Sequence, residues 1–319
     1  MAITIEAVYE ARKRIAPYII ETPLLRLRNL DPFLGCQVYV KAECMQTTGA
    51  FKIRGALNKL LALSSEQLGC GVVAASSGNH GRAVAYGAKL LGTEATIVMP
   101  RTSAPIKIEN IRALGAKVVL CDAAERFQIA ERLCAQQGAV MIPPYNDEDI
   151  MAGQGTIGAE IAEQCAELDM VIAPVSGGGL LGGVSTALKA LAPGIRVYGA
   201  EPEALPRYSA SLSVGHPVTV ERRASIADAL VSNTPGSICF PYVLKNTDAV
   251  VAVDDEHLLR GMKLLLTEGK LLAEPSSCIG LGAVLQRNIP VTPEKRVCFI
   301  LSGGSVGLDQ LDRLKEVSI

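Results

Sequence analysis

Short apolar runs alternate with longer segments of helical spacing along most of the chain. The apolar runs are rich in β-branched residues and predict strands: GVVAASS at 71–77, ATIVMP at 95–100, KVVLC at 117–121, DMVIAPV at 169–175, RVYGAE at 196–201 and RVCFIL at 296–301. The segments of helical spacing lie at 79–91, 105–115, 123–138 and from about residue 180. Continuous apolar strands separated by helices are typical of parallel sheets covered on both faces. The pattern therefore predicts an α/β fold.

The remaining segments complete the predicted architecture. Residues 1–20 alternate charged with apolar positions and predict an amphipathic helix rather than a signal peptide. Residues 205–247 have the weakest periodicity, and we expect them to run over the surface. We predict two domains, each with a mostly parallel, twisted sheet flanked by helices. The large domain comprises residues 1–65 and 143–319, and the small domain comprises residues 66–142.

The composition of the 319-residue chain excludes several classes of protein. Its formal net charge of -1 provides no electrostatic footprint for nucleic acid. No run approaches the roughly 18 apolar residues of a membrane span. Nine cysteines without a C-x-x-C pair, and only three histidines, argue against a disulfide framework and a structural zinc site. We expect reduced thiols, a cytoplasmic location, and His216 and His257 at the surface.

Three predicted strands end in loops of serine and glycine, at 72–81, 171–183 and 298–307. Ligands of open parallel sheets bind beyond the carboxyl ends of the strands, where backbone N–H groups and helix N-termini face the crevice. The second loop offers consecutive N–H groups from Ser176 to Leu180, which is the arrangement that binds a phosphate.

Lys52 begins a predicted helix within TGAFKIRGALNKL (48–60). A cation is disfavoured at this end of the helix dipole. Either its stem covers apolar surface while the ammonium reaches water, or its amine is a nucleophile or base. A phosphate site together with such a lysine suggests pyridoxal phosphate, whose aldehyde forms a Schiff base with a lysine amine.

Two other interpretations remain open from the residues alone. Gly177 to Gly182 satisfies G-x-G-x-x-G, and Glu201 follows about 20 residues later, which is the fingerprint of a nicotinamide dinucleotide site. That interpretation accounts neither for Lys52 nor for the other two loops. A non-catalytic protein that binds a small molecule is the second alternative.

The sequence resembles the pyridoxal-phosphate enzymes of the serine/threonine dehydratase and serine racemase group, of fold type II. The matching motifs occur in the family's order: TPLLRL, KAECMQTTGAFKIRGA (41–56), SSGNHGRAVAYGAK (76–89), AGQGT (152–156), SGGGLLGG (176–183), AEP (200–202), SIAD (225–228), AEPSS (273–277) and LSGG (301–304). They cover nearly the whole chain.

The resemblance implies a role for each matching residue. Lys52 is expected to bind the cofactor aldehyde and then to act as the base at the substrate α-carbon, with Ser77 opposite it. The remaining cofactor contacts are expected from Phe51, Asn79, Ser176, Gly177, Gly178, Gly179, Leu180, Glu274 and Ser302. The substrate is expected to bind the loop of Ser76, Ser77, Gly78, Asn79 and His80. Glu274 is equally consistent with a helix N-terminal acid, and Asp228 with a structural cap.

The sequence departs from the family pattern near the substrate. Ala229 follows Asp228 where glycine is common, and Ser305 replaces asparagine. Metal-dependent members bind a divalent cation with a glutamate, here Glu201, and an acidic residue six positions on. Arg207 stands at that second position, so we expect no divalent cation there.

The resemblance implies an ammonia-lyase that converts a β-hydroxy amino acid, by default L-threonine or L-serine, to a 2-keto acid and ammonia. The alternatives are a serine racemase, or a dehydratase of 3-hydroxyaspartate or of a hydroxyectoine-derived amino acid. A homodimer is expected, with a small amino acid as the other partner. Nucleic acid and membrane are not expected partners.

Overall fold

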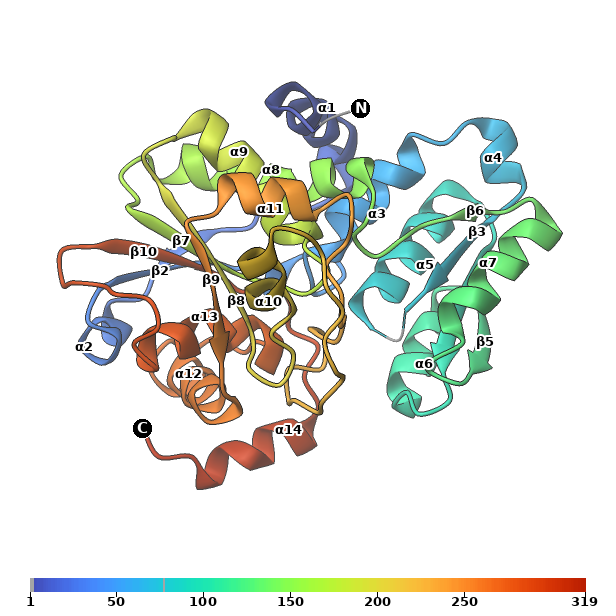
Figure 1. Ribbon diagram of the computed structural model, residues 1–319. Coiled ribbons are helices and arrows are strands. Elements are labelled where there is room, and N and C mark those ends of the chain that lie inside the picture. Colours follow the sequence, from blue (N-terminus) through green and yellow to red (C-terminus); the bar gives the residue numbers. More distant parts are fainter. Residues whose placement is uncertain (1–2, 77) are drawn as a thin grey trace.

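A computed structural model describes residues 3–76 and 78–319, and its strands form two sheets (Figure 1). The larger sheet has the order β1-β2-β10-β7-β8-β9. Its strands are β1 (Leu24–Arg26), β2 (Gln37–Lys41), β7 (Met170–Pro174), β8 (Arg196–Pro202), β9 (Ala249–Val253) and β10 (Arg296–Ile300). All neighbours in it are parallel except β1 and β2, which pair antiparallel.

The smaller sheet has the order β5-β4-β3-β6, and all of its strand pairs are parallel. Its strands are β3 (Val72–Ala75), β4 (Ala95–Pro100), β5 (Lys117–Cys121) and β6 (Val140–Met141). These strands all lie within residues 66–142, the range predicted for the small domain. The domain limits themselves stay a prediction.

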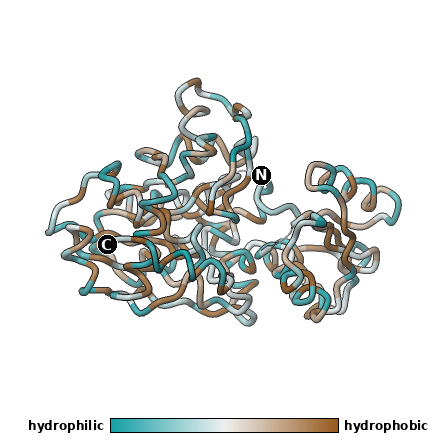
Figure 2. Tube along the Cα trace, turned by 90° about the horizontal axis from the view of Figure 1, so that it is seen from below, coloured by the Kyte–Doolittle hydropathy of each residue, from teal (hydrophilic) through white to brown (hydrophobic). Residues whose placement is uncertain are grey.

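Helices cover both faces of each sheet. Those of the larger part are α1 (Ile5–Ile15), α2 (Asp31–Leu34), α3 (Lys52–Leu61), α8 (Glu148–Gln164), α9 (Gly179–Leu191), α10 (Arg207–Val214), α11 (Phe240–Asn246), α12 (Asp255–Thr267), α13 (Pro275–Leu285) and α14 (Leu308–Asp312). Those of the smaller part are α4 (Ser65–Gly69), α5 (Asn79–Leu91), α6 (Pro105–Ala113) and α7 (Arg126–Gln137). Figure 2 shows the two parts side by side, with hydrophobic segments running through each.

Burial on both faces explains why the strands are continuously apolar. Successive side chains of a strand point to opposite faces. In β7, Met170 and Ile172 therefore join the core beneath α12 and α13, whereas Val171 and Ala173 join the core beneath α8 and α9. Every residue of β7 is buried, so an alternation with polar residues is absent.

The structure corrects one expectation and adds elements that the sequence analysis did not mark. The stretch 205–247 does not lie wholly on the surface, because α10 and α11 bring the buried residues Tyr208 and Phe240 into the core beneath α9. The unmarked elements are β1, β2, β6, β9, α2, α4, α8 and α10 to α14. No helix among the described residues is long and apolar enough to cross a membrane.

Candidate active site

A cavity of about 690 Å³ lies where the carboxyl ends of both sheets meet. Ser76 follows β3, Ser176 follows β7 and Ser302 follows β10, so all three serine- and glycine-rich loops face it. The predicted site residues that line it are Phe51, Lys52, Ser76, Gly78, Asn79, His80, Ser176, Gly177, Gly178, Gly179, Leu180, Glu274 and Ser302. Ser77 lies outside the described residues.

Lys52 is the first residue of α3, and its amine points into the cavity wall. The backbone N–H of Phe51 donates to the Ser302 carbonyl (3.0 Å), which ties the start of α3 to the loop after β10. The Lys52 Nζ donates to the Pro144 carbonyl at 2.5 Å. Burial lowers the pKa of Lys52 from 10.5 to about 8, against the opposing attraction of Cys239 and Glu274. A larger fraction of this amine than of an ordinary lysine amine is therefore neutral and nucleophilic near physiological pH.

The loop 176–180 forms a cradle of backbone N–H groups at the start of α9. Gly178 has a φ of +104°, and a Cβ there would overlap the Tyr208 hydroxyl. That hydroxyl donates to the Gly177 carbonyl at 3.1 Å and so fixes the turn. The first N–H groups of a helix have no partner within it, and here they face the cavity. This arrangement suits a phosphate dianion.

Asn79, Glu274 and Ser305 form a hydrogen-bonded group on the opposite wall. The Asn79 Nδ2 lies 3.0 Å from both Glu274 carboxylate oxygens, and the Ser305 hydroxyl donates to the Asn79 Oδ1 at 2.6 Å. Burial raises the pKa of Glu274 to about 7, although the hydrogen bond from Asn79 opposes it. Glu274 occupies the N-cap position of α13 without a capping side-chain bond. Its side chain thus belongs to the cavity rather than to the helix end.

Ser302 presents a hydroxyl to the cavity. Its Oγ lies 3.0 Å from the Oγ of Ser277, and Ser277 accepts from the Gly303 N–H and donates to the Gly303 carbonyl. Ser277 lies within the matching motif AEPSS, but its contact with Ser302 depends on the packing of α13 against β10. The motif therefore contains Ser277 but does not predict its contact with Ser302.

His80 is buried and neutral. Its Nε2 lies 2.8 Å from the Ile142 carbonyl, so this nitrogen carries the proton. Burial and the nearby Lys52 lower the pKa of His80 to about 3. His80 therefore contributes shape and a dipole to the cavity wall, but no positive charge.

The acidic residue of the dinucleotide fingerprint is not available to a ribose. Glu201 is fully buried, and its carboxylate accepts from the backbone N–H groups of Tyr208 (2.8 Å) and Ser209 (2.7 Å). It does not line the cavity. The nicotinamide interpretation is therefore wrong.

Arg207 lies beside Glu201 and is also fully buried. Its Nε is 3.9 Å from the Glu201 carboxylate, and its guanidinium donates to three backbone carbonyls, those of Val175, Leu205 and Leu230. Across residues 3–76 and 78–319, no group of three or more His, Cys, Asp or Glu side chains is placed to hold a metal ion.

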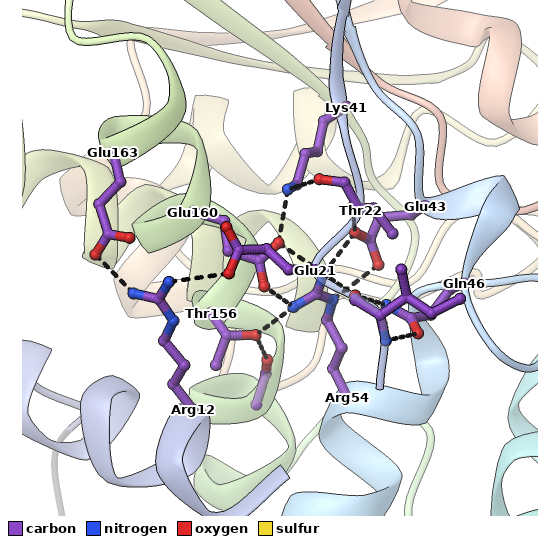
Figure 3. Close-up of polar contacts among 12 residues, drawn as sticks. Arg12, Glu21, Thr22, Lys41, Glu43, Gln46, Arg54, Thr156, Glu160 and Glu163 are labelled. Carbon is purple, nitrogen blue, oxygen red and sulfur yellow. Dashed lines mark hydrogen bonds and ion pairs between the residues drawn. The ribbon is translucent and has the colours of Figure 1, made fainter. Parts of the chain in front are cut away.

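A buried network behind α3 holds the helix that carries Lys52 (Figure 3). Arg54 donates to Glu43 and to Glu160, with distances of 2.5 to 2.8 Å, and Lys41 donates to Glu160 at 2.6 Å. Two cations and two carboxylates are thus enclosed together. Although burial raises the pKa of Glu43, the Arg54 guanidinium holds it below its usual value.

Several cavity residues were missed by the sequence analysis. Lys107 on α6, Arg126 on α7 and Arg222 line the cavity, and Lys107 pairs with Asp228 at 3.2 Å. Asp228 is thus an ion-pair partner at the cavity, beside Ala229. Lysines and arginines are common on solvated helices, so nothing in their spacing marked these three.

The chemistry of the lining fits pyridoxal phosphate. A lysine amine of lowered pKa can bind an aldehyde, the cradle at α9 can bind a phosphate, and the Ser302 hydroxyl can meet a ring nitrogen. All three groups lie at the wall of the same cavity.

Comparisons with known proteins agree with this chemistry. Residues 15–303 match the family described as pyridoxal-phosphate dependent enzyme. The chain is 40% identical to the L-threonine ammonia-lyase of Thermotoga maritima, over 98% of this chain and 78% of that protein. It is 39% identical to the L-threo-3-hydroxyaspartate ammonia-lyase of Saccharomyces cerevisiae, over 94% and 93%. The solved structure of maize serine racemase matches with a TM-score of 0.93 at 39% identity, over 98% of this chain and 97% of that one. The chain belongs to the family of pyridoxal-phosphate dependent enzymes.

Proposed function

We propose that the protein eliminates water from a β-hydroxy amino acid and releases a 2-keto acid and ammonia, with L-threonine and L-serine as the first substrates to test. The observation that carries the proposal is the position of the Lys52 amine, which lies at the wall of the same cavity as the backbone cradle at 176–180 and the Ser302 hydroxyl. Two of the relatives named above are ammonia-lyases. When bound, pyridoxal phosphate supplies an aldehyde for the substrate amine and a ring that accepts electrons from the α-carbon.

The residues of this chain then divide the work. Lys52 takes the proton from the substrate α-carbon, because its amine is neutral in part near physiological pH. The cradle at 176–180 holds the phosphate, and the loop at 76–80 receives the substrate carboxylate. Asn79 is held in one orientation by Glu274 and Ser305, so its amide is positioned before any ligand arrives. The β-hydroxyl leaves as water, and the remaining enamine hydrolyses to the keto acid and ammonia.

The neutral hydroxyl of Ser302 favours elimination. A carboxylate opposite a ring nitrogen would keep that nitrogen protonated and strengthen the ring as an electron acceptor. A hydroxyl does not keep the nitrogen protonated, so the negative charge left at the α-carbon expels the β-hydroxyl before the carbon takes up a new proton.

Racemisation is the second candidate, since maize serine racemase has the same fold at 39% identity. Ser77, the residue expected to protonate the second face of the substrate, lies outside the described residues. The position of Lys52 alone therefore does not distinguish elimination from racemisation.

One assay tests both candidates. The holoenzyme is incubated with L-serine, L-threonine and L-threo-3-hydroxyaspartate, and keto acid, ammonia and D-amino acid are measured together. We expect keto acid and ammonia in equal amounts, with little D-amino acid. Predominant D-serine with little pyruvate would overturn the lyase proposal in favour of a racemase.

We also propose a cytoplasmic homodimer, as the resemblance implies. Reduced cysteines support the location, since none of the nine forms a disulfide. Light scattering should give twice the 33.6 kDa mass of the chain. A mass equal to one chain at micromolar concentration would refute the dimer.

A further inference from the structure

The hydroxyl of Ser302 has one hydrogen-bond partner among the described residues, the hydroxyl of Ser277. The two Oγ atoms lie 3.0 Å apart, and either of them can be the donor. Ser302 lines the cavity, whereas Ser277, the third residue of α13, does not line it and is only 1% exposed. Any effect of Ser277 on a ligand in the cavity must therefore pass through Ser302.

The backbone of Gly303 holds the Ser277 hydroxyl from two sides. The Gly303 N–H donates to the Ser277 Oγ at 2.7 Å, and the Ser277 hydroxyl donates to the Gly303 carbonyl at 2.8 Å. A hydroxyl has one proton and two lone pairs. With these two bonds made, Ser277 keeps one lone pair, which can accept the proton of Ser302.

The hydrogen bonds around Ser277 can also run in the opposite direction. The Gly303 carbonyl accepts from the Glu274 N–H at 3.0 Å, so it keeps a donor when the Ser277 proton turns away from it. That proton then goes to the Ser302 Oγ, and the proton of Ser302 points into the cavity. Ser302 can therefore present either a lone pair or a proton to a ligand.

A pyridine ring nitrogen requires both arrangements, one for each of its protonation states. Without a proton, the nitrogen is an acceptor and takes the proton of Ser302. With a proton, it donates to the Ser302 Oγ, and the proton of Ser302 must find another acceptor, which Ser277 provides. If the Ser277 hydroxyl were absent, protonation of the ring would leave a buried hydroxyl proton unpaired, which is unfavourable.

We propose that Ser277 is a positioning residue that acts through Ser302 and allows the ring nitrogen of bound pyridoxal phosphate to take up a proton. The premise is that Ser302 faces this nitrogen, as the resemblance implies. A protonated ring accepts more electron density from the α-carbon and so gives the carbon time to take up a new proton. The inference rests on the proposed function and adds that Ser277 sets how much racemisation accompanies elimination.

The test follows the ring nitrogen by nitrogen NMR during a pH titration of holoenzyme whose cofactor is isotopically labelled at that atom. We expect Ser277→Ala to lower the pKa of the ring nitrogen by about one unit or more. Ser277→Cys, which keeps the volume but offers only a weak acceptor, should lower it less. An unchanged or raised pKa in Ser277→Ala would overturn the proposal. So would a wild-type nitrogen that takes up no proton at the lowest pH at which the holoenzyme stays folded.

Ser276→Ala is the matched control. Ser276 is the preceding serine of α13, is equally enclosed, and accepts from the Ala229 N–H at 3.0 Å. Its loss therefore also leaves one N–H without a partner, but it does not touch Ser302. The pKa of the ring nitrogen should stay at the wild-type value, and equal shifts in Ser276→Ala and Ser277→Ala would reduce Ser277 to a structural role.

Other groups titrate on the elements around the two serines. They are Lys52 of α3, His80 of α5, Glu274 and Cys278 of α13, and the pair of Lys107 and Asp228. The pKa of Glu274 is about 7 and that of Lys52 about 8, so both change charge within the titration. Neither serine substitution removes any of these groups, so their effect is common to both variants and cancels in the comparison.

A double-mutant cycle tests whether Ser277 acts through Ser302. Ser302→Ala removes the hydroxyl that faces the nitrogen, so adding Ser277→Ala should not change the pKa of the nitrogen further. A second shift as large as the one in the wild-type background would overturn the proposed route. A wild-type pKa in Ser302→Ala would refute the premise that Ser302 faces the ring.

Deuterium uptake at the α-carbon of L-alanine in deuterium oxide tests the consequence for the reaction, because L-alanine has no β-hydroxyl to lose. Above both pKa values of the nitrogen, Ser277→Ala should slow this uptake by up to about tenfold, since each unit of pKa removes that share of the protonated ring. L-serine should then yield a smaller share of D-serine. Unchanged uptake beside a lowered pKa would refute the role in racemisation. The NMR titration needs no turnover, so its result stands even if no hydroxy amino acid yields keto acid and the proposed function fails.

Discussion

The amine of Lys52 lies where a positive charge is opposed twice, by the N-terminal end of α3 and by burial in the cavity wall. A lysine that only covered apolar surface would extend its ammonium to water. Lys52 instead contacts the Pro144 carbonyl inside the protein. The unfavourable environment of the Lys52 ammonium is therefore better explained by a chemical role of the neutral amine than by packing.

Covalent binding of the cofactor at this residue is the first prediction. The purified protein should be yellow, and borohydride should fix the cofactor on a peptide that contains Lys52. Lys52→Ala should lower turnover by roughly 10³-fold or more, since base catalysis and covalent attachment are lost together. Full turnover by Lys52→Ala would place the active site elsewhere or favour a non-catalytic binding protein.

The depressed pKa of Lys52 also predicts how the stability of the cofactor-free protein depends on pH. Between about 8 and 10.5, the unfolded chain binds a proton at Lys52 that the folded chain has lost. The free energy of unfolding therefore rises with pH across this window, and the penalty is fully present below it. Urea titrations of wild type and Lys52→Met should show a stability difference that favours the variant below pH 8 and shrinks toward pH 10.5. A difference independent of pH would contradict the depressed pKa.

At the scale of elements, the sequence marked six strands but left β1, β2, β6, β9 and several helices unmarked, of which α8 is the longest. Strands such as β7 are apolar throughout because both faces are buried. This pattern can be recognised from the residues of the strand itself. In α8, by contrast, Gly153, Gly155 and Gly158 lower the helix propensity, so it went unmarked. A Cβ at Gly153 would meet the backbone of α3, and one at Gly155 or Gly158 would meet the backbone of α9. These glycines serve the close packing of three helices, which only the folded chain reveals.

The network behind α3 predicts a large cost for removing one of its charges. Arg54→Met leaves Glu43 and Glu160 buried against a single remaining cation, so the free energy of unfolding should fall by about 3–5 kcal/mol. Urea denaturation measures the loss. Lys13→Ala, which removes an exposed pair with Glu10, is the control and should change stability by less than about 1 kcal/mol. A loss for Arg54→Met no larger than that of the control would show that the network is dispensable.

The junction of β8 and α10 carries the prediction about metals. Arg207 places a cation beside Glu201 and donates to three neighbouring backbone carbonyls, the kind of oxygen that a divalent ion binds. Magnesium and manganese should therefore raise neither activity nor melting temperature, and a chelator should lower neither. An ion coordinated by Glu201 in a crystal grown with manganese would refute this expectation.

Across the whole molecule, the cavity draws its walls from both sheets, and this limits what a sequence can predict. The glycine- and serine-rich loops were identifiable because a close approach to a ligand requires small residues. Arg126 and Arg222 were not, since they lie 96 positions apart on segments without a motif, and only the folding of both parts brings them to one cavity. The wall formed by Lys52 and the three loops was therefore predictable, and the wall that carries Arg126 and Arg222 was not.

The shared cavity predicts that the cofactor stabilises both parts together. Asn79 of the smaller part is hydrogen-bonded to Glu274 and Ser305 of the larger part, so a ligand held against this group touches both. At a hundredfold excess over its Kd, a ligand of the folded state adds about 2.7 kcal/mol to the free energy of unfolding. Removal of pyridoxal phosphate should lower the melting temperature and speed hydrogen exchange at 79–91 as well as at 176–191. Asn79→Ala should weaken the effect at 79–91 and leave that at 176–191, because the phosphate cradle does not depend on Asn79. Slower exchange at 176–191 alone in the wild-type holoenzyme would show that the cofactor binds the larger part only, and that the two walls are not coupled through it.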